Sequence, residues 1–323
     1  MDFLRNVTSG RNVPDERLAE VAEQYALFGG RSPINDQCRD LVSALDQRLA
    51  ADIRELPVYF GTRNWHPFLS DTVRQMTKDG RQRAAVFVTS AFGSYSGCRQ
   101  YQEDLARARD EVGPAAPALE KLRLFYNHPG FINPQVRSLK RALGSLTGCA
   151  SVRVVFSAHS IPQSMAAGCE YEAQLNEAAK LIMDGLGADG LGSDGGRFDV
   201  VFQSRSGPPR VPWLEPDIND HLRTIAAQGA DGVVVVPIGF TSDHMEVMFD
   251  LDTQAAQTAD SLGLVFERIP TVGTDPDYVA MVVDLIDELA SGASPVALGS
   301  SGPWRMPCPD DHCPPPARRP AAG

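Results

Sequence analysis

The sequence has no long hydrophobic run. Its longest apolar stretches, such as Val233–Ile238, fall far short of the ~18 residues that a membrane-spanning helix needs. The first residues, Met1–Val7, form no hydrophobic signal region. We therefore expect a protein without a membrane span that acts in the cytoplasm.

Positive charge is also scarce. Thirty Lys and Arg residues stand against 41 Asp and Glu, which leaves a formal net charge of −11, and no basic cluster is present. Recognition of a phosphate backbone needs such a cluster, so nucleic acid is not an expected partner. The chain has 323 residues, of which 43% are apolar and 22% charged, a composition typical of folded proteins.

Cysteine is too sparse for a disulfide framework. Six cysteines in a chain of this length indicate buried thiols or metal ligands instead. Two catalytic motifs are absent as well. No GxGxxG follows the early predicted strands, which disfavours dinucleotide binding, and no G-x-S-x-G elbow supports a serine hydrolase.

Short runs rich in Val and Phe alternate with longer stretches of helical periodicity, as in βαβ units. This alternation predicts an α/β fold with a largely parallel sheet. We expect strands at 56–61, 84–90, 122–127, 152–158, 198–203, 232–240 and 264–270. We expect helices at 14–27, 36–54, 67–79, 98–112, 133–144, 170–186, 217–228, 244–262 and 276–290.

The two halves of this pattern differ. From Val152 to Leu289 each strand is followed by one helix, whereas the first half begins with two helices that follow no strand. Either the halves differ in design, or a first strand belongs upstream of Met1 and the sequence starts inside a longer reading frame. We favour the second interpretation. We expect an N-terminal half at 1–145, a second half at 146–292 and a Pro-rich tail at 293–323.

Polar segments follow three predicted strands of the second half. In an open α/β sheet, ligands bind outside the carboxyl ends of the strands. The segments are FSAHSIP at 156–162, FQSRSGPP at 202–209 and GFTSDHME at 239–246. We expect them to converge at one rim of the sheet.

These segments hold a histidine and several acids. A strand-end histidine such as His159 is, by itself, more often a hydrogen-bonded structural residue than a ligand. Asp243, Glu246 and Asp250, however, recur at i, i+3 and i+7, which predicts three carboxylates along one helix face. An N-cap and a solvated acidic face explain Asp243 well and Asp250 poorly. Carboxylates beside an imidazole also suit a hydrated divalent cation, and Fe²⁺ in transit is one candidate.

The same segments resemble the three motif blocks of the ferrochelatase family, in the family's order. The blocks are FSAHSIP at 156–162, FQSRSGPPRVPWLEP at 202–216 and PIGFTSDHMEVMFDLD at 237–252. Weaker similarity covers most of the chain, including GGRSPIN at 29–35, FGTRNWHPF at 60–68 and TSAFGSYSGCRQY at 89–101.

The resemblance implies a lyase of haem biosynthesis that inserts Fe²⁺ into a porphyrin. It implies a chelatase-like fold in which the porphyrin lies in a cleft between two similar Rossmann-like, doubly wound halves with parallel sheets. His159 corresponds to the family's catalytic histidine, and Glu246 to the carboxylate that faces it and the metal. Asp250 continues an acidic path for the metal, but the next acid of that path is replaced by Gln254.

The resemblance also bears on the substrate. Ser32 and Tyr101 match positions that contact porphyrin propionates in bacterial relatives, and Arg31, Arg63 and Arg99 are further donors nearby in the sequence. The residues of these motif blocks are most similar to those of actinobacterial ferrochelatases, which implies coproporphyrin III as substrate. Protoporphyrin IX is the alternative. Other enzymes of the haem pathway are expected partners for hand-off.

Many family members hold a [2Fe–2S] cluster through one cysteine of the first half and three of the C-terminus. Cys98, Cys308 and Cys313 match three of these ligands. The resemblance implies His312 as the fourth ligand, because imidazole serves as a cluster ligand in some proteins. Cys149 or Cys169 is the alternative fourth ligand.

Three rival functions stay open from sequence. A cobalt or nickel chelatase for a sirohydrochlorin-type ring would share the architecture, although the long 202–216 block argues against it. A haem- or porphyrin-binding protein without turnover would follow if the first strand is truly absent. A purely structural α/β module would leave His159 and Glu246 unexplained.

Overall fold

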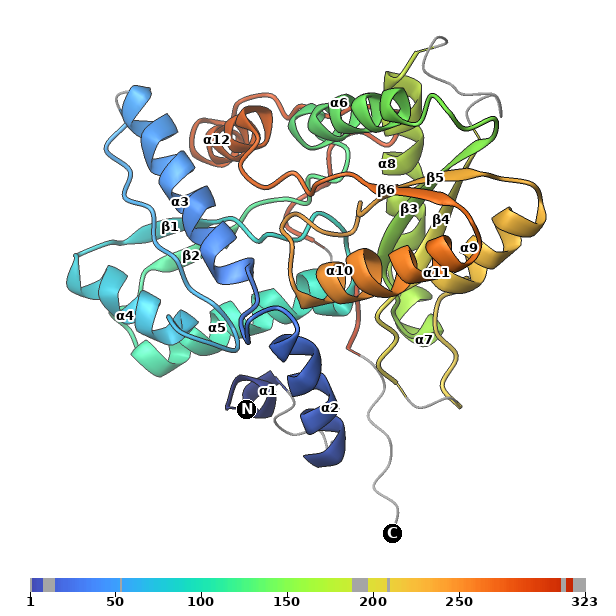
Figure 1. Cartoon of the computed structure of the whole chain (residues 1–323). Coiled ribbons are helices and arrows are strands. Elements are labelled where there is room, and N and C mark those ends of the chain that lie inside the picture. Colours follow the sequence, from blue (N-terminus) through green and yellow to red (C-terminus); the bar gives the residue numbers. More distant parts are fainter. Residues whose placement is uncertain are drawn as a thin grey trace.

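The computed structural model describes residues 2–7, 15–52, 54–187, 197–207, 210–308 and 312–315. In these residues the chain forms two parallel β-sheets with helices packed around them (Figure 1). The predicted α/β class is confirmed. The tail predicted at 293–323 lies only partly within the described residues.

The larger sheet has four parallel strands in the order β4-β3-β5-β6. They are β3 (Val152–His159), β4 (Phe198–Gln203), β5 (Gly232–Val236) and β6 (Val265–Arg268). The chain runs outward from β3 to β4 and then returns past β3 to β5 and β6. The winding therefore reverses between β3 and β5, as in doubly wound sheets.

Helices cover both faces of this sheet, which is why β3 and β5 are nearly continuous apolar runs. Val154 and Phe156 belong to a core that includes α6 (Pro129–Ser145), α8 (Tyr171–Gly185) and α12 (Pro276–Ser291). Val155, Val233 and Val235, which alternate with them, belong to a second core with α9 (Ile218–Ala227) and with the helix that follows β5.

The helix that follows β5 changes its hydrogen-bonding pattern midway. It consists of α10 (Met245–Phe249), the π-helical turn η3 (Asp250–Ala255) and α11 (Ala256–Ser261). The helix predicted at 244–262 is confirmed in extent, but nothing in the periodicity predicts the π-helical turn. π-Helical turns are rare in proteins, and those that occur are often found at functional sites.

The smaller sheet pairs β1 (Arg83–Val86) with β2 (Ala118–Lys121), in a parallel register that sets Arg83 opposite Ala118. It lies to the left in Figure 1, while α6 and α12 run along the top between the two sheets. The other elements of this region are α1 (Asp2–Val7), α2 (Asp15–Ala26), α3 (Ile34–Ala51), α4 (Leu69–Lys78), the π-helical turn η1 (Tyr95–Arg99) and α5 (Gln100–Val112).

Two predicted strands are wrong. Residues 56–61 are extended but form no strand in the described part of the chain, and Pro57 has no backbone N–H to donate to a neighbour. The strand predicted at 122–127 lies earlier, as β2. Leu124 and Phe125 are nevertheless almost fully buried, so the apolar run there marks core packing rather than strand pairing. Similarly, β5 ends before Pro237 instead of continuing to 240.

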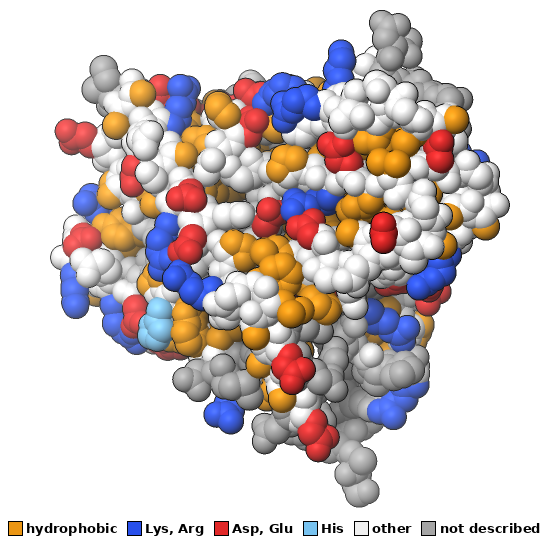
Figure 2. All heavy atoms as spheres, viewed as in Figure 1, with side chains coloured by type: hydrophobic (Ala, Val, Ile, Leu, Met, Phe, Trp, Pro, Cys, Tyr) orange, Lys and Arg blue, Asp and Glu red, His pale blue; other side chains and the backbone are white. Residues whose placement is uncertain are grey.

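The predicted helices are confirmed within a few residues. In the described ranges, the helices that were not predicted are the short helices α1 and α7 (Gln163–Ala166). Among the described residues, no helix is both long and apolar enough to span a membrane. Figure 2 shows Lys and Arg side chains intermixed with Asp and Glu over the viewed face, so charge of one sign does not dominate it.

Candidate active site

The candidate site lies at the carboxyl ends of β3 and β5, where the winding reverses. β3 ends at His159, and the loop after β5 leads into α10. Gly239 lets this loop pass β3 closely, because a Cβ at Gly239 would lie 2.8 Å from the Cα and Cβ atoms of Ala158. The close approach brings the start of α10 beside the end of β3.

His159 and Glu246 meet at this point. The Nε2 atom of His159 lies 3.5 Å from Oε1 of Glu246. Their side chains are 32% and 48% exposed, so both reach solvent although protein surrounds them on most sides. The structure therefore brings together the two residues that the sequence analysis pairs.

The backbone fixes the orientation of the His159 imidazole. Its Nδ1 is hydrogen-bonded to the carbonyl oxygen of Ser160, which leaves Nε2 facing Glu246. Burial lowers the pKa of His159, but the hydrogen bond and the charge of Glu246 outweigh this effect and raise the pKa above its ordinary value. His159 is therefore a stronger proton acceptor than a free imidazole.

Glu246 lies between two imidazoles. The Nδ1 atom of His244, the N-cap of α10, accepts the backbone N–H of Glu246 at 3.1 Å and lies 3.8 Å from its Oε2. Burial raises the pKa of Glu246, but His159 lowers it to about 2, so the carboxylate is ionised at neutral pH. Burial lowers the pKa of His244, which is therefore neutral under the same conditions.

Asp250 begins the π-helical turn, one turn after Glu246. Burial and the charge of Glu246 raise its pKa to about 6, although a hydrogen bond from the Ser204 hydroxyl opposes the shift. Ser204 has a φ of 62°, a left-handed conformation that is strained for serine. Strain of this kind is common at functional sites, where it aims a side chain.

Asp243 does not share a helix face with Glu246 and Asp250, and the prediction of three aligned carboxylates is wrong on this point. His244, not Asp243, caps α10. Asp243 lies in the preceding loop, where its Oδ1 accepts hydrogen bonds from Arg268 at 3.1 Å and from Thr271 at 3.2 Å. Arg268 also donates two hydrogen bonds to Asp252, at 2.8 and 2.7 Å, and so ties the loop and the π-helical turn to β6.

Two buried side chains, Gln203 and Tyr171, hydrogen-bond to the backbone of Glu246 and of His159. Gln203, at the end of β4, donates from Nε2 to the Glu246 carbonyl at 2.8 Å and accepts the Ser157 hydroxyl at Oε1. Tyr171 donates its hydroxyl to the carbonyl of His159 at 3.0 Å. The backbone of each member of the pair is therefore fixed by its own buried donor.

The region of the smaller sheet also reaches this site. Gln37 of α3 accepts the backbone N–H of Asp243 at 2.8 Å, and Thr241 donates to the carbonyl of Thr89 at 3.1 Å. Tyr25 of α2 lies near the Glu246 carboxylate. Burial and the charge of Glu246 together raise the pKa of Tyr25 to about 12.

The predicted porphyrin contacts lie before α3 and in α5. Arg31 is 74% exposed and pairs with Asp36 at 3.0 Å. The hydroxyl of Ser32 accepts the backbone N–H of Ile34 at 3.4 Å. The Tyr101 ring lies 3.9 Å from the guanidinium carbon of Arg63, in a cation–π contact. Their role toward a porphyrin stays a prediction.

A second group of interacting side chains consists of four cysteines. Cys98 and Cys313 are buried, and the charges of Cys98 and Cys308 help to raise the pKa of Cys313. The largest effect on that pKa is a hydrogen bond that Cys313 shares with Cys169. His312 touches this group through Nδ1, 3.0 Å from the Cys313 sulfur.

This thiol group, Cys98, Cys169, Cys308 and Cys313, has the donor set of a [2Fe–2S] site, because four cysteine thiolates are the usual ligands of such clusters. Among the described residues, no three His, Cys, Asp or Glu side chains converge tightly enough to hold a single metal ion.

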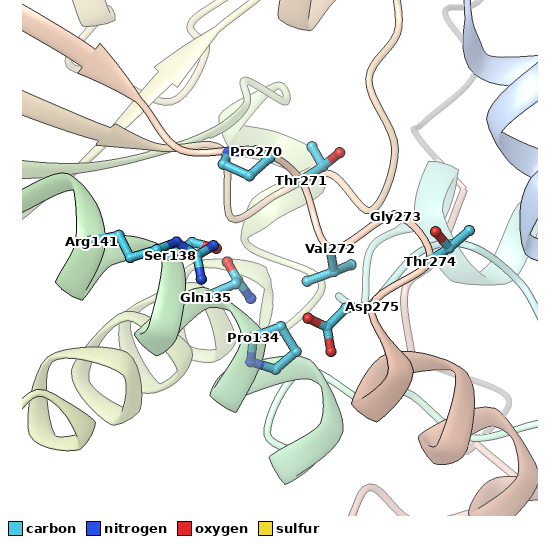
Figure 3. A pocket seen from close by; sticks show the side chains of 10 residues that line it. All are labelled: Pro134, Gln135, Ser138, Arg141, Pro270, Thr271, Val272, Gly273, Thr274 and Asp275. Carbon is cyan, nitrogen blue, oxygen red and sulfur yellow. The ribbon is translucent and has the colours of Figure 1, made fainter.

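A cavity of about 340 Å³ lies apart from both groups (Figure 3). It opens between α6 and the segment that joins β6 to α12, and its lining includes Gln135, Ser138, Arg141 and Thr271. Neither His159 nor Glu246 lines it, so it adds nothing to the candidate site.

A family model for ferrochelatases matches residues 1–290. The chain belongs to the ferrochelatase family. Related ferrochelatases match over the full chain. The "Ferrochelatase" of Rhodopirellula baltica is 48% identical over 100% of this chain and 91% of its own length. The "Coproporphyrin III ferrochelatase" of Frankia alni is 50% identical over 99% and 84%, and that of Nocardia farcinica 48% identical over 100% and 94%.

Solved structures of other chelatases share the fold of this ferrochelatase. The sirohydrochlorin chelatase SirB of Bacillus subtilis, in complex with cobalt, superposes with a TM-score of 0.52 at 11% identity, over 79% of this chain and 90% of SirB. A multi-domain Deinococcus radiodurans protein similar to chelatases gives 0.54 at 17% identity, over 80% of this chain and 52% of its own. The predicted chelatase-like fold is confirmed.

Several residues of the candidate site are not predicted from the sequence. His244 stands in the third motif block, two residues before Glu246, and that spacing on a helix start is a usable signal. Gln203 ends a strand within the second block and could have been chosen on the same grounds as His159. Tyr25 and Tyr171 carry no local signal, because only the fold brings them to the site.

Proposed function

We propose that this ferrochelatase inserts Fe²⁺ into coproporphyrin III to give coprohaem, as a lyase of haem biosynthesis. The observation that carries the proposal is the 3.5 Å approach of His159 Nε2 to Glu246 Oε1 at the strand ends, in a chain of this family. The names of the relatives from Frankia alni and Nocardia farcinica support coproporphyrin III as the porphyrin.

His159 and Glu246 can take up the two protons that the porphyrin must lose. Two pyrrole N–H bonds break as Fe²⁺ enters, so the charge of the ion is balanced by the protons that leave. A neutral His159 accepts one proton at Nε2, and the ionised Glu246 stabilises the imidazolium or accepts a proton in turn. The short distance between the two groups lets protons pass toward solvent through the half-exposed carboxylate.

We assign the delivery of Fe²⁺ to the same helix. Glu246 and Asp250 lie one turn apart at its start, and oxygen ligands suit a hydrated divalent cation. Gln254 follows four residues after Asp250, so this path ends in an amide rather than a carboxylate. We therefore propose that the outer metal-binding position of some relatives is weakened here while the inner path is retained.

We assign the porphyrin carboxylates to Arg31, Ser32 and Tyr101. A guanidinium and two hydroxyl groups are suitable donors to carboxylates. Arg63 stacks on the Tyr101 ring and is itself paired with Asp104.

We further propose a resident [2Fe–2S] cluster held by cysteine thiolates in which Cys98, Cys308 and Cys313 take part. When bound, it would cross-link the chain segments that carry its ligands through iron–sulfur bonds. All six cysteines are free of disulfides, which agrees with a reducing compartment such as the cytoplasm. Transfer of product to another enzyme of the haem pathway completes the proposal.

An anaerobic Fe²⁺ insertion assay with both porphyrins tests the proposal. We expect turnover with coproporphyrin III, slower turnover with protoporphyrin IX, and loss of both in Glu246→Gln. Glu120→Gln is a matched control, because Glu120 pairs with Arg83 on the smaller sheet. Tight porphyrin binding without insertion by the wild-type protein would favour a binding protein, and a preference for Co²⁺ with a sirohydrochlorin-type ring would favour the cobalt chelatase.

A further inference from the structure

We infer that the cavity of about 340 Å³ beside α6 is an activating effector site for a small organic anion, one that carries a carboxylate or phosphate group together with a hydroxyl group. The site is distinct from the candidate active site, since neither His159 nor Glu246 lines the cavity. Binding of the anion is independent of the proposed function, whereas its effect on turnover rests on that function.

One face of α6 forms the first wall of the cavity. Gln135, Ser138 and Arg141 follow one another at intervals of three residues, which sets them on one side of the helix. Figure 3 shows the side chains of Arg141 and Gln135 directed toward the space between α6 and the segment 270–275, which forms the opposite wall. The volume is at the lower end of the roughly 300–1,000 Å³ that is typical of small-molecule sites, so it suits a ligand smaller than a tetrapyrrole.

Arg141 has donors that the protein does not use. Among the described residues its one hydrogen bond runs from Nη2 to the Ser138 hydroxyl at 3.0 Å, and no carboxylate pairs with it. Arg137, one turn earlier, instead pairs with Asp275 at 2.8 Å and with Asp277 at 2.6 Å, so the acid at the rim of the cavity is already neutralised. A guanidinium binds a carboxylate or a phosphate through two parallel hydrogen bonds, which makes an anion the expected ligand of Arg141.

Gln135 supplies a buried acceptor to the same cavity. The residue is only 4% exposed, and its Nε2 donates to the carbonyl of Phe131 at 2.9 Å. No group in the described ranges donates to its Oε1, which lies on the cavity side of α6 (Figure 3). Buried polar groups are almost always hydrogen-bonded, so this oxygen needs a donor inside the cavity. A hydroxyl group on the ligand provides one.

The segment 270–275 adds backbone donors to the opposite wall. The N–H groups of Thr271, Val272 and Thr274 have no acceptor in the part of the chain that the structure describes, although all three residues line the cavity. Val272 is only 6% exposed, and buried N–H groups are almost always paired in proteins. Unpaired N–H donors on the wall opposite a guanidinium favour an oxyanion as the ligand.

This wall is also bonded to the loop that leads into α10. The N–H of Gly273 donates to the carbonyl of Thr241 at 3.0 Å, and the hydroxyl of Thr271 donates to Oδ1 of Asp243 at 3.2 Å. Glu246 follows three residues after Asp243, so the wall of the cavity supports the loop that positions Glu246. A ligand that binds best when the wall is in place also stabilises this loop, which is the condition for coupling between two sites.

Isothermal titration calorimetry of the metal-free, full-length protein tests the binding, with malate and glycerol 3-phosphate as probes. We expect a dissociation constant below about 1 mM for at least one of them, and the probe that binds identifies the anionic group as a carboxylate or a phosphate. Succinate and methyl phosphate are the matched probes without the hydroxyl group. Each should bind roughly fivefold more weakly than its counterpart, because one hydrogen bond is lost.

Substitutions locate the bound probe. Arg141→Gln should weaken binding roughly tenfold or more, because a charge-assisted hydrogen bond is lost, and Ser138→Leu should block the cavity. Arg141 is exposed, so its replacement leaves the core intact. Lys140→Gln is the matched control, since it removes the same charge from the next residue of α6, which does not line the cavity. Arg31→Gln, in the proposed porphyrin site, should also bind the probe like the wild type.

Turnover is then measured at saturating coproporphyrin III and fixed total Fe²⁺, with and without the probe. We expect the probe to raise the turnover of the wild type and of Lys140→Gln roughly fivefold relative to Arg141→Gln. Chelation of iron by the probe is common to the three proteins and cancels in this comparison.

Three results would overturn the site: no binding of either probe to the wild type, unchanged binding in Arg141→Gln, or loss of binding in Arg31→Gln. Binding at the cavity with unchanged or lower turnover would overturn its activating role. Binding by a protein that inserts no iron into either porphyrin would refute the proposed function and leave the site standing.

Discussion

The two sheets differ in how completely they are buried. In the four-stranded sheet, every residue of β5 and most of β3 are inaccessible to solvent, with helices on both faces. In the two-stranded sheet, Arg83 and Ala85 of β1 are exposed. The large sheet therefore forms a rigid platform for groups that must meet at a fixed distance, whereas the smaller sheet can adjust.

The residues proposed for proton transfer and those proposed for porphyrin binding lie in the regions of different sheets. His159 ends the buried strand β3, and Glu246, 3.5 Å away, lies in the helix that follows the buried strand β5. The predicted porphyrin contacts, Arg31, Ser32 and Tyr101, lie in the region of the smaller sheet and are partly exposed. Proton transfer needs fixed geometry, while binding of a large flat substrate tolerates side chains that move.

The largest expected effect tests whether the chemistry belongs to the large sheet. His159→Ala should lower the rate of iron insertion by roughly a thousandfold or more, about 4 kcal/mol. Porphyrin binding, measured by fluorescence quenching, should stay within roughly tenfold, ~1.4 kcal/mol. His221→Gln, which alters a histidine on α9 that pairs with Asp199, serves as the control. Normal turnover in His159→Ala would refute its catalytic role.

A pair of core substitutions tests the difference in burial itself. Val235→Ala removes two methyl groups from a fully buried strand and should lower the free energy of unfolding by about 2–3 kcal/mol. Val86→Ala, in half-buried β1, should cost less than ~1 kcal/mol. Urea unfolding at pH 7.5 measures both. Equal losses would show that the two sheets are equally well packed.

The third prediction concerns the pH dependence of stability and tests His128, which caps α6. Its Nδ1 accepts the Gly130 N–H at 3.0 Å, and burial lowers its pKa from 6.5 to about 4. The native state thus keeps His128 neutral while the unfolded chain takes up a proton below pH 6.5. Stability from this group is complete above pH 6.5 and falls as the pH drops toward 4, by about 2 kcal/mol between pH 7.5 and 5.

His128→Asn isolates that effect, because the asparagine side-chain oxygen can accept the Gly130 N–H in place of Nδ1 but does not titrate. Unfolding of the wild type and the variant at the two pH values gives the difference directly, and acid effects shared by both proteins cancel. A pH dependence of the same size in both proteins would exclude His128 as its source.

The smallest effect is expected in the region of the smaller sheet. Tyr101→Phe should raise the KM for coproporphyrin III roughly fivefold, ~1 kcal/mol, with kcat unchanged, because one hydrogen bond to a carboxylate is lost. Tyr59→Phe is the control, since its hydroxyl binds the surface residue Asp79. A fall in kcat without a change in KM would move Tyr101 from substrate binding to the chemistry.

The sequence predicts the large sheet better than the small one for a physical reason. β3 and β5 are buried on both faces, so their composition alone identifies them. Residues 122–127 are also largely apolar, but beyond Leu122, which still donates to the Val86 carbonyl, they pack into the core outside any strand, and composition cannot tell these cases apart. Residues 56–61 read as a strand although they have no strand partner among the described residues.

The residues of the candidate site that the sequence predicts are those whose place depends on a strand end or on helical spacing. Strand-end logic selects His159, and helical spacing selects Glu246 and Asp250. The same spacing wrongly includes Asp243, because the true start of α10 is set by His244 as its cap. Contacts between distant segments, such as Tyr171 with His159 or Cys169 with Cys313, need the folded chain, since no spacing in the sequence encodes them.

Two hydrogen bonds between the regions of the sheets have a mechanical consequence. Gln37 and Thr89 bind the loop that carries Asp243 and Thr241, immediately before Glu246. Any hinge-like opening between these regions must first break both bonds, at a net cost of about 1 kcal/mol each. Opening would also free the loop that leads into α10, so a more open molecule would hold Glu246 less firmly beside His159.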